Sequence, residues 1–288
     1  MRQSNCSSTC TRTWNVVFPG HCALGTRVMF RRSIVDKISR NYSDEELITR
    51  VWDVENIKRL VHKRVYYLAE DRRADELKEL WVSDPKHQKT ASFGRNWGYY
   101  TGMDEIKAYY VDNHNTRLLE QKELNAADDL NVGNIYAHPA STGLVELAGD
   151  GKSAKGMWYC IAQETTALAD GTADARWILE KVAVDFLKEG DDWKIWHIVI
   201  AMDLNCEAGE AYEKQSVYVD WDNDPVKCEF GVPTIEKLLH DPTFNWWDNY
   251  PFMPEPYASF CDEISYGPEG FVITADKVFA AGEGRNYK

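Results

Sequence analysis

The feature that most limits the fold of this chain is a series of four apolar, alternating segments in its second half. They cover residues 143–148, 154–166, 176–188 and 193–204. Short turns separate them, with the sequences Gly149-Asp150-Gly151, Ala169-Asp170-Gly171 and Glu189-Gly190-Asp191-Asp192. Alternating runs joined by such turns are typical of strands that follow one another in an antiparallel meander. The pattern therefore predicts an antiparallel sheet.

Three helices are expected before this sheet. Ser43, followed three residues later by Glu46, is the capping-box signature of a helix start, and apolar residues then recur at helical spacing as far as Ala69. A second, shorter helix is expected over residues 75–82 and a third over 103–113, with an aromatic, glycine-punctuated segment between them. Helices followed by a meander predict an α+β domain whose helices pack on one face of the sheet.

Composition divides the 288 residues into three parts. Residues 1–42 carry seven Arg or Lys against one acid and lack the apolar run of a secretory signal, so we expect a poorly structured tail. A transit peptide, a dispensable tail and a true start at Met29 all fit that segment. Residues 43–206 form the expected α+β domain. Residues 207–288 are rich in aromatic residues and proline, with one short helix expected over 234–240. We expect them to form an extended arm packed on the domain or on a neighbouring protomer.

Charge and composition exclude several kinds of partner and cofactor. The net charge of −13 argues against nucleic-acid binding, because phosphate contacts require a basic surface. No segment approaches the roughly 18 apolar residues of a membrane span. The seven scattered cysteines lack zinc-ligand spacing, which favours reduced thiols, a cytoplasmic location and no bound metal. The motifs of nucleotide-binding proteins, metalloproteases and α/β-hydrolases are missing, so no cofactor is expected. The 11 Trp, 15 Tyr and 10 Phe suit a pocket for a ring-bearing ligand.

The end of the first helix and two of the strands carry a family resemblance. The helix ends in Tyr66-Tyr67-Leu68-Ala69-Glu70-Asp71 and a short helix follows, while Gly156-Met157-Trp158 and Trp193–His197 fit later strands. In this order of elements, the stretch from about Val54 to Leu204 resembles the SnoaL-like domains of the nuclear transport factor 2-like superfamily. Members include scytalone dehydratase, bile-acid 7α-dehydratase, ketosteroid isomerase and polyketide cyclases. The resemblance implies a cone-shaped, curved antiparallel sheet closed by three N-terminal helices, a cystatin-like α+β barrel with an apolar cavity at one end.

The same resemblance implies a set of catalytic residues. The histidine falls on His138, the acid on Glu70 or Asp71, and the tyrosine on Tyr66 or Tyr67. Tyr66 with Glu70 and Tyr67 with Asp71 are both spaced i, i+4, which puts a hydroxyl and a carboxylate on one helix face. His138 would act as general base or acid, since imidazole titrates near neutral pH. The carboxylate would orient the imidazole, and the tyrosine would hydrogen-bond the substrate oxygen.

Other candidates come from the residues themselves. His197 lies in a strand with apolar residues on both faces, so we expect it to be buried. It is then either a core histidine paired with Asp185 or, if its face is concave, a further catalytic residue in the cavity. Aromatic candidates for substrate contact lie on the first helix, the glycine-punctuated segment and the second long strand: Tyr67, Trp97, Tyr100, Trp158 and Tyr159. Three histidines lie among polar residues and are expected on the surface: His62, His87 and His114.

Together these residues predict a cofactor-independent lyase or isomerase acting on a hydrophobic aromatic or polycyclic small molecule. Dehydration is the most economical reaction, because one histidine can remove a proton and later donate it to the leaving hydroxide. An isomerase or a carbon–carbon lyase would use the same groups.

The alternative is a non-catalytic module of the same fold that binds a small molecule or a protein. A third possibility is the small subunit of a ring dioxygenase, which needs a partner chain. A homo-oligomer, dimer or trimer, is expected. The enzyme hypothesis requires His138 to meet Glu70 or Asp71 within hydrogen-bond reach inside one cavity.

Overall fold

The computed structural model describes residues 42–95, 98–116, 118, 131–168, 170–210, 231–232 and 251–270. The tail expected over 1–42, apart from Tyr42, and the helix expected over 234–240 lie outside these residues. Within the described ranges, no helix is both long enough and apolar enough to cross a membrane.

Helix α2 (Asp44–Ala69) begins at the predicted capping box. Ser43 Oγ accepts a hydrogen bond from the Glu46 amide at 3.2 Å, and Glu46 Oε2 accepts one from the Ser43 amide at 2.7 Å. These two bonds satisfy amides that the first helical turn leaves without a partner. The apolar stripe predicted for this helix is buried, with Ile57, Leu60 and Val61 in the core. The predicted start and end of the helix are both confirmed.

The remaining helices are short. Helix α3 (Arg73–Leu80) starts two residues before the predicted helix and ends before Trp81, which bridges to a strand instead. Helix α4 (Pro85–Gln88) follows. The third predicted helix begins as α5 (Met103–Lys107) and continues as a π-helix, η1 (Ala108–Asn113). A 3-10 turn, η5 (Asp262–Ile264), lies near the end of the described chain.

The four predicted strands form the centre of the sheet. They are β4 (Ala140–Leu147), β5 (Ser153–Ala167), β6 (Ala173–Glu189) and β7 (Asp192–Glu207), each paired antiparallel with the next. A further short strand, β3 (Ile135–Ala137), pairs with the far end of β5.

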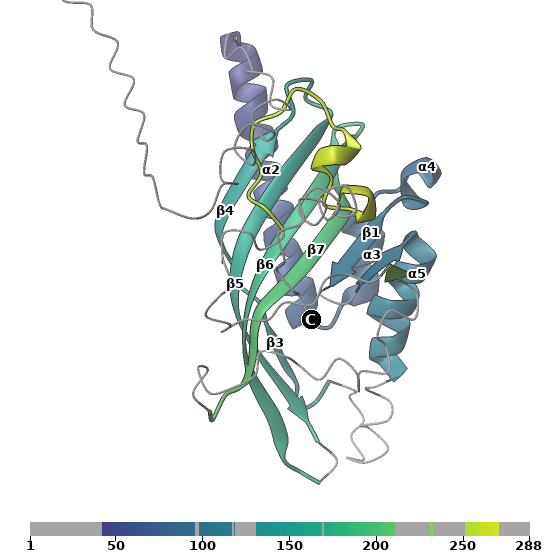
Figure 1. Ribbon diagram of the computed structural model, residues 1–288, viewed down its shortest axis with the longest axis vertical. Helices are drawn as coiled ribbons and strands as arrows, with labels where there is room; N and C mark the ends of the chain where they lie inside the picture. Colours follow the sequence, from purple (N-terminus) through teal and green to yellow (C-terminus); the bar gives the residue numbers. More distant parts are fainter. Residues whose placement is uncertain are drawn as a thin grey trace, which may run out of the picture. The chain divides into compact units, whose positions relative to one another are not determined.

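The aromatic segment between the helices forms two more strands, β1 (Ser92–Arg95) and β2 (Gly98–Thr101), which the sequence pattern did not predict. Strand β2 pairs with the two-residue strand β8 (Gly231–Val232). Strand β1 lies parallel to β7, with Phe93 opposite Ile198, so the sheet is not antiparallel throughout. The sheet is curved and open, in the order β3-β5-β6-β7-β1-β2-β8 (Figure 1). The fold is α+β, as predicted.

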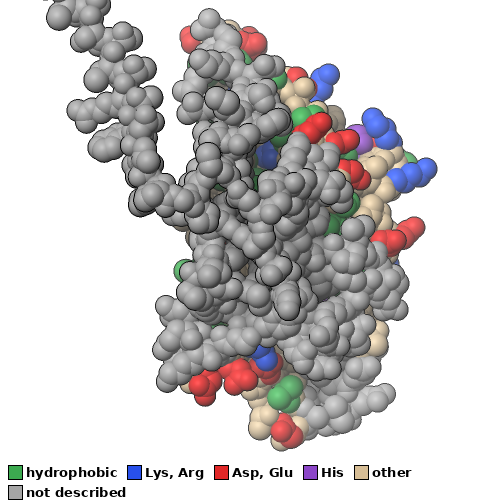
Figure 2. All heavy atoms as spheres, in the orientation of Figure 1, with side chains coloured by type: hydrophobic (Ala, Val, Ile, Leu, Met, Phe, Trp, Pro, Cys, Tyr) green, Lys and Arg blue, Asp and Glu red, His purple; other side chains and the backbone are tan. Residues whose placement is uncertain are grey.

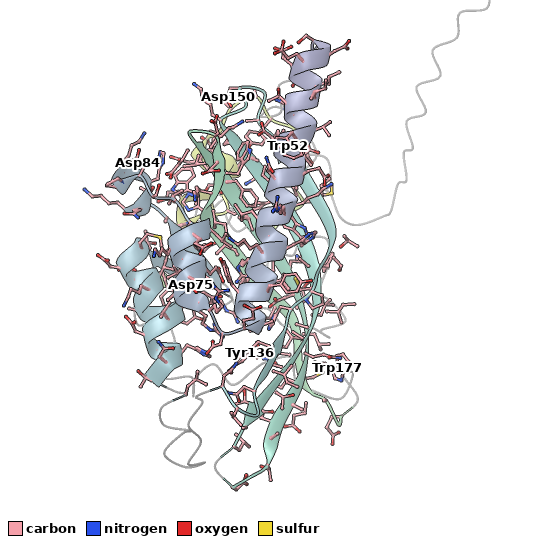
Figure 3. The ribbon with its side chains drawn as sticks, turned by 180° about the vertical axis from the view of Figure 1, so that it is seen from behind. Trp52, Asp75, Asp84, Tyr136, Asp150 and Trp177 are labelled. Carbon is pink, nitrogen blue, oxygen red and sulfur yellow. The ribbon has the colours of Figure 1, made fainter. Side chains whose placement is uncertain are left out.

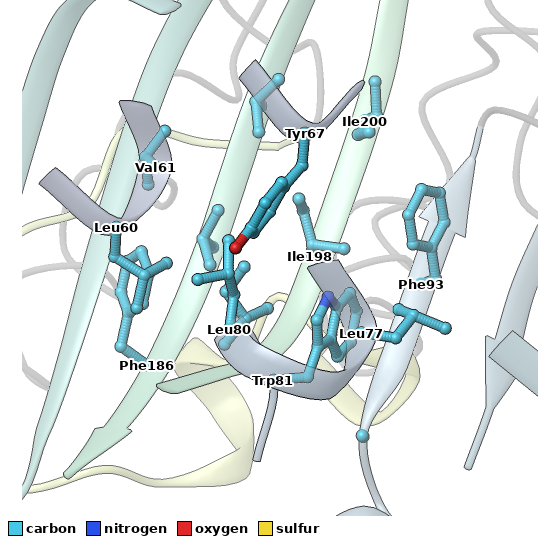
Figure 4. Packing of buried hydrophobic residues seen from close by; sticks show 14 of the residues in the cluster. Leu60, Val61, Tyr67, Leu77, Leu80, Trp81, Phe93, Phe186, Ile198 and Ile200 are labelled. Atoms are coloured by element: carbon cyan, nitrogen blue, oxygen red, sulfur yellow. The ribbon is translucent and has the colours of Figure 1, made fainter. Parts of the chain in front are cut away.

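The two faces of the sheet are covered differently. Helices α2 and α3 lie behind it in Figure 1, and the main core lies between them and the inner face. Figure 4 shows this packing, in which Tyr67 of α2 and Trp81 after α3 lie on the same side of the sheet as Ile198 and Phe186. Residues 251–270 pack on the outer face. There, Tyr266 joins a smaller cluster with Tyr99, Met157, Ala183 and Val199. Acidic and basic side chains are mixed along the edge that carries α4 (Figure 2).

Candidate functional site

A cavity of about 260 Å³ lies between the helices and the inner face of the sheet. Figure 3 shows Tyr136, one of its wall residues, just beyond the C-terminal end of α2. Apolar and aromatic side chains form part of the wall: Leu68, Phe93, Tyr109, Tyr110, Leu118, Tyr136 and Ile200. Polar and charged side chains form the rest: Arg64, Arg73, Arg95, Asn113, His114, His138, Glu164, Thr166 and Glu180. A cavity with this many converging ionisable groups is suited to acid/base chemistry.

The end of α2 places Asp71 beside this cavity through an unusual backbone conformation. The amides of Asp71 and Arg72 donate to the carbonyls of Leu68 and Tyr67, at 3.1 and 2.7 Å, which is the Schellman pattern of helix ends. Asp71 occupies the left-handed position of that pattern, with φ of 55°. Glycine is the usual residue there, because a Cβ atom makes this conformation unfavourable. Asp tolerates this position better than most other residues with a side chain, and here its carboxylate contacts His114 and Arg73.

The π-helix places His114 on the opposite wall. In η1 the chain takes more than four residues per turn, so Tyr109, Tyr110, Asn113 and His114 all line the cavity. Tyr100 stacks on Tyr109 from behind, with ring centroids 3.9 Å apart. Local π-helical turns are frequent at functional sites, where they bring neighbouring side chains onto one face.

Asp71 and His114 form a close pair. His114 Nε2 lies 2.6 Å from Asp71 Oδ1, and Arg73 Nε lies 3.1 Å from the same oxygen. All three side chains are about one-seventh exposed or less. Burial raises the pKa of Asp71, but the hydrogen bonds and charges of His114 and Arg73 outweigh it, so that pKa lies below its ordinary value. Asp71 is therefore a carboxylate that orients and polarises the imidazole.

A second histidine cluster lies in the same cavity. His138 Nδ1 lies 2.9 Å from Glu180 Oε1, and His138 Nε2 lies 2.8 Å from Glu164 Oε1. Burial disfavours the charged ring, but the charge of Glu180 and the hydrogen bonds to both carboxylates outweigh it and raise the pKa of His138 to about 9. At neutral pH this ring is an imidazolium with both N–H groups directed at carboxylates. It is a fixed positive charge rather than a free base.

A buried network supports the wall between the two histidines. Tyr110 donates its hydroxyl to Glu76 at 2.6 Å, and Arg64 pairs with the other oxygen of Glu76 at 3.0 Å. Burial and the neighbouring Glu76 carboxylate raise the pKa of Tyr110 above its ordinary value, so it remains a neutral donor. The Arg73 guanidinium stacks over Tyr110, 4.8 Å from the ring centroid. Among the described residues, no three His, Cys, Asp or Glu side chains are grouped as metal ligands are.

Comparison with known proteins identifies the family. The model of the SnoaL-like domain matches residues 49–199, which is more than half of the chain. The chain belongs to the SnoaL-like family. No curated protein matches it in sequence.

Solved structures match about 57% of this SnoaL-like chain. A proposed scytalone dehydratase from Novosphingobium aromaticivorans is 10% identical over 58% of this chain and 94% of its own, with a TM-score of 0.41. A hexachlorocyclohexane dehydrochlorinase from Novosphingobium barchaimii is 12% identical over 57% and 96%, with a TM-score of 0.41. An NTF2-like protein with a cystatin-like fold from Novosphingobium aromaticivorans is 17% identical over 57% and 92%, with a TM-score of 0.37.

The structure separates the residues predicted to act together. His138 lies in the cavity, but its partners are Glu164 and Glu180, not Glu70 or Asp71. Glu70 is more than half exposed and pairs with Arg72 at 3.3 Å. Tyr66 is 67% exposed, so the predicted Tyr66–Glu70 pair faces solvent rather than the cavity. Of the predicted acids, Asp71 is the one with a histidine partner, and that partner is His114.

The aromatic candidates for substrate contact lie behind or away from the cavity wall. Tyr67 is buried in the core and donates its hydroxyl to Glu79 at 2.5 Å, not to Asp71. Tyr100 and Trp158 are fully buried core residues, and Tyr159 is half-buried on the outer side of β5 by strand alternation. None of these four lines the cavity. Trp97 lies outside the described residues.

His197 is buried, as predicted, but on the outer face of the sheet. Its Nδ1 lies 2.9 Å from Ser92 Oγ, whereas the expected partner, Asp185, pairs with Lys155 at 2.5 Å. Burial and the nearby Lys155 charge lower the pKa of His197 to about 3, so the ring is neutral. His197 belongs to the core beneath residues 251–270 and does not reach the cavity.

The prediction that His114 lies on the surface is wrong, and the sequence held a signal against it. Ile106, Tyr110 and His114 are spaced i, i+4, i+8, so a continuous helical face joins the histidine to two buried residues. Glu164 and Glu180 were also missed. Each occupies an inward position of an alternating strand, and a charged residue there indicates a site or a buried pair.

Proposed function

We propose that the chain is a cofactor-independent lyase of the dehydratase type, with Asp71 and His114 as its acid/base pair. The observation that supports this most is the 2.6 Å contact between His114 Nε2 and Asp71 Oδ1 at the wall of the cavity. A base held by a carboxylate beside a substrate-sized cavity is the arrangement that proton abstraction requires. This proposal replaces the predicted His138–Glu70 couple.

The proposed reaction uses one histidine twice. Because Asp71 is ionised, its Oδ1 accepts a hydrogen bond from the Nε2–H group of His114, and in that neutral tautomer the lone pair lies on Nδ1. Nδ1 removes a proton from a substrate carbon next to an activating group. The electrons of that C–H bond form the carbon–carbon double bond, and the C–O bond breaks toward oxygen. The leaving hydroxide takes the proton back from Nδ1 and departs as water, so the ring returns to its starting state.

Arg73 adjusts this pair from behind. Its 3.1 Å contact with Asp71 keeps the carboxylate ionised, which secures the orientation of His114. The same positive charge opposes the formation of a full imidazolium on His114. His138, already cationic, adds a positive potential that stabilises negative charge developing on the substrate.

The test is a screen of ring-containing hydroxy compounds for loss of water. The reaction is detected by the change in mass and by the ultraviolet absorbance of the new double bond. His114→Ala is expected to lower turnover by about 10²–10⁴-fold, the usual contribution of a general base. His62→Ala is the matched control, because His62 is exposed on α2 and outside the cavity wall. Equal turnover in the two variants would remove His114 from the mechanism. Ligands that bind without turnover in the wild type would favour the non-catalytic alternative.

A further inference from the structure

Glu180 carries an unsatisfied oxygen at the cavity wall. Its side chain is 3% exposed, and Oε1 is used by His138 at 2.9 Å. The second oxygen, Oε2, is buried and has no hydrogen-bond partner among the residues that the structure describes. Buried carboxylate oxygens are rarely left without a donor, because desolvation then goes uncompensated. Since Glu180 lines the cavity, the missing donor can come from a bound molecule.

The neighbours of Glu180 restrict what that donor can be. Cys160 lies directly opposite Glu180 on the neighbouring strand, and burial together with the Glu180 charge raises the pKa of its thiol to about 12. The charge of Glu180 also acts on Arg64. An ionised carboxylate on the ligand has no hydrogen to donate to Oε2. A neutral group with an O–H bond satisfies Oε2 without adding charge.

The size of the cavity restricts the ligand further. At about 260 Å³ it is below the range of about 300–1,000 Å³ that is typical of pockets for drug-sized ligands. A single substituted ring suits this volume better than a polycyclic system. Apolar wall residues such as Phe93, Leu68 and Ile200 would pack on the ring itself.

From these contacts we infer that Glu180 Oε2 accepts a hydrogen bond from a substrate hydroxyl, so the substrates are hydroxylated single-ring compounds. The inference rests on the proposed function only in taking the cavity as the substrate site. The hydroxyl is one that the substrate keeps, because a hydrogen bond given to a carboxylate increases electron density on the oxygen and disfavours its departure. Glu180 thus determines specificity, while His114 carries out proton transfer.

The test compares two probes of equal shape, 4-ethylphenol and 4-ethyltoluene, by ligand-observed NMR titration of the full chain. The wild type is expected to bind the phenol about 10–100-fold more tightly, the range of a hydrogen bond to a charged group. Glu180→Gln is expected to reduce this preference to a few-fold, because the carboxylate charge is lost. Glu164→Gln is the matched control. It also removes one carboxylate from His138 but leaves Glu180 Oε2 in place, so the preference should remain.

Each outcome decides the inference. Equal binding of the two probes by the wild type, or no binding of either at millimolar concentration, would overturn it. A preference that persists fully in Glu180→Gln would also overturn it, since another group would then recognise the hydroxyl. Because this readout is binding, it is independent of turnover: a clear phenol preference without dehydration would contradict the proposed function and leave the role of Glu180 intact. Should Glu180→Gln fail to fold, the wild-type ratio and the Glu164→Gln control still decide the result.

Discussion

The two faces of the sheet both bury ionisable groups, but they use them differently. On the outer face, Asp185 pairs with Lys155 at 2.5 Å and accepts further bonds from Ser265 and the amide of Tyr266. On the inner face, Glu180 shares one oxygen with His138 and leaves the other unsatisfied beside a cavity. The outer cluster is closed by the chain itself, whereas the inner cluster leaves one carboxylate oxygen without a partner among the described residues.

The difference teaches that burial of charge does not identify a site. Burial shifts the pKa values of Lys155 and Asp185 toward their neutral forms, although neither residue lines the cavity. Their role is to hold residues 251–270, since Lys155 also lies 3.4 Å from the centre of the Tyr266 ring. Perturbed groups indicate function only when a cavity and an unsatisfied atom accompany them.

The largest expected effect is on the outer face. Asp185→Ala leaves Lys155 buried without a partner, and we expect the free energy of unfolding to fall by about 3–5 kcal/mol. Urea denaturation followed by circular dichroism measures this. The double variant Lys155→Met/Asp185→Leu removes both charges and should recover most of the loss. A single variant as stable as the wild type would show that this pair does not hold the segment.

The histidines of the two faces should give opposite pH dependence of stability. The folded-state pKa of His138, about 9, exceeds its unfolded value, so its contribution is complete below about pH 6.5 and is lost as pH rises through 9. That of His197, about 3, lies below the unfolded value, so its contribution is present above about pH 6.5 and is lost as pH falls toward 3.

Variants at each histidine separate the alkaline loss of stability from the acid loss. His138→Gln should flatten the alkaline loss, which amounts to roughly 3 kcal/mol in the wild type. His197→Asn should reduce the acid loss only in part. Asp71, Glu164 and Glu189 also have lowered pKa values, so the protein loses their contributions to stability in acid as well. Thermal unfolding between pH 4 and 10 gives both curves. Identical curves for the two variants would contradict the assignment of the rings to different environments.

The smallest expected effect on stability is at Asp71. Asp71→Gly removes a Cβ atom from a left-handed position, which offsets the lost contacts with His114 and Arg73, so the free energy of unfolding should change by no more than about 1 kcal/mol. Turnover is expected to fall to a similar level in Asp71→Gly and in Asp71→Asn, which keeps the shape of the side chain but not its charge. Asp185→Ala and Asp71→Gly can therefore be compared directly. Removing the carboxylate is expected to lower the free energy of unfolding at Asp185 and to lower turnover at Asp71. A loss of stability at Asp71 as large as that at Asp185 would break the distinction.

The parts of the fold that could be predicted from the sequence are those set by local patterns. The capping box at Ser43, the apolar stripe of α2 and the alternation of β5, β6 and β7 depend on neighbours a few residues apart. The parallel contact of β1 with β7 was not predictable in this way, because it joins residues about 105 positions apart through aromatic residues without clear alternation.

The candidate site shows the same limit. Asp71 was found because a family resemblance points to the end of the first helix, but its partner lies 43 residues further along the chain. Only tertiary packing brings the Schellman turn and the π-helix together. His138 was predicted near a pocket and lines the cavity, but its carboxylate partners lie on two strands that follow it in the chain. The cytoplasmic location, the homo-oligomer and the absence of nucleic-acid and membrane partners stay predictions.

The most direct test of the central claim, that His114 is the general base, is chemical rescue. His114→Ala opens space at the cavity wall that free imidazole can enter. With a substrate found by the dehydration screen, we predict that added imidazole restores a measurable part of the lost turnover, and that the restored rate rises with pH as imidazole loses its proton. Full turnover in His114→Ala without imidazole would contradict the account. So would an equal increase in rate when imidazole is added to the control variant His62→Ala.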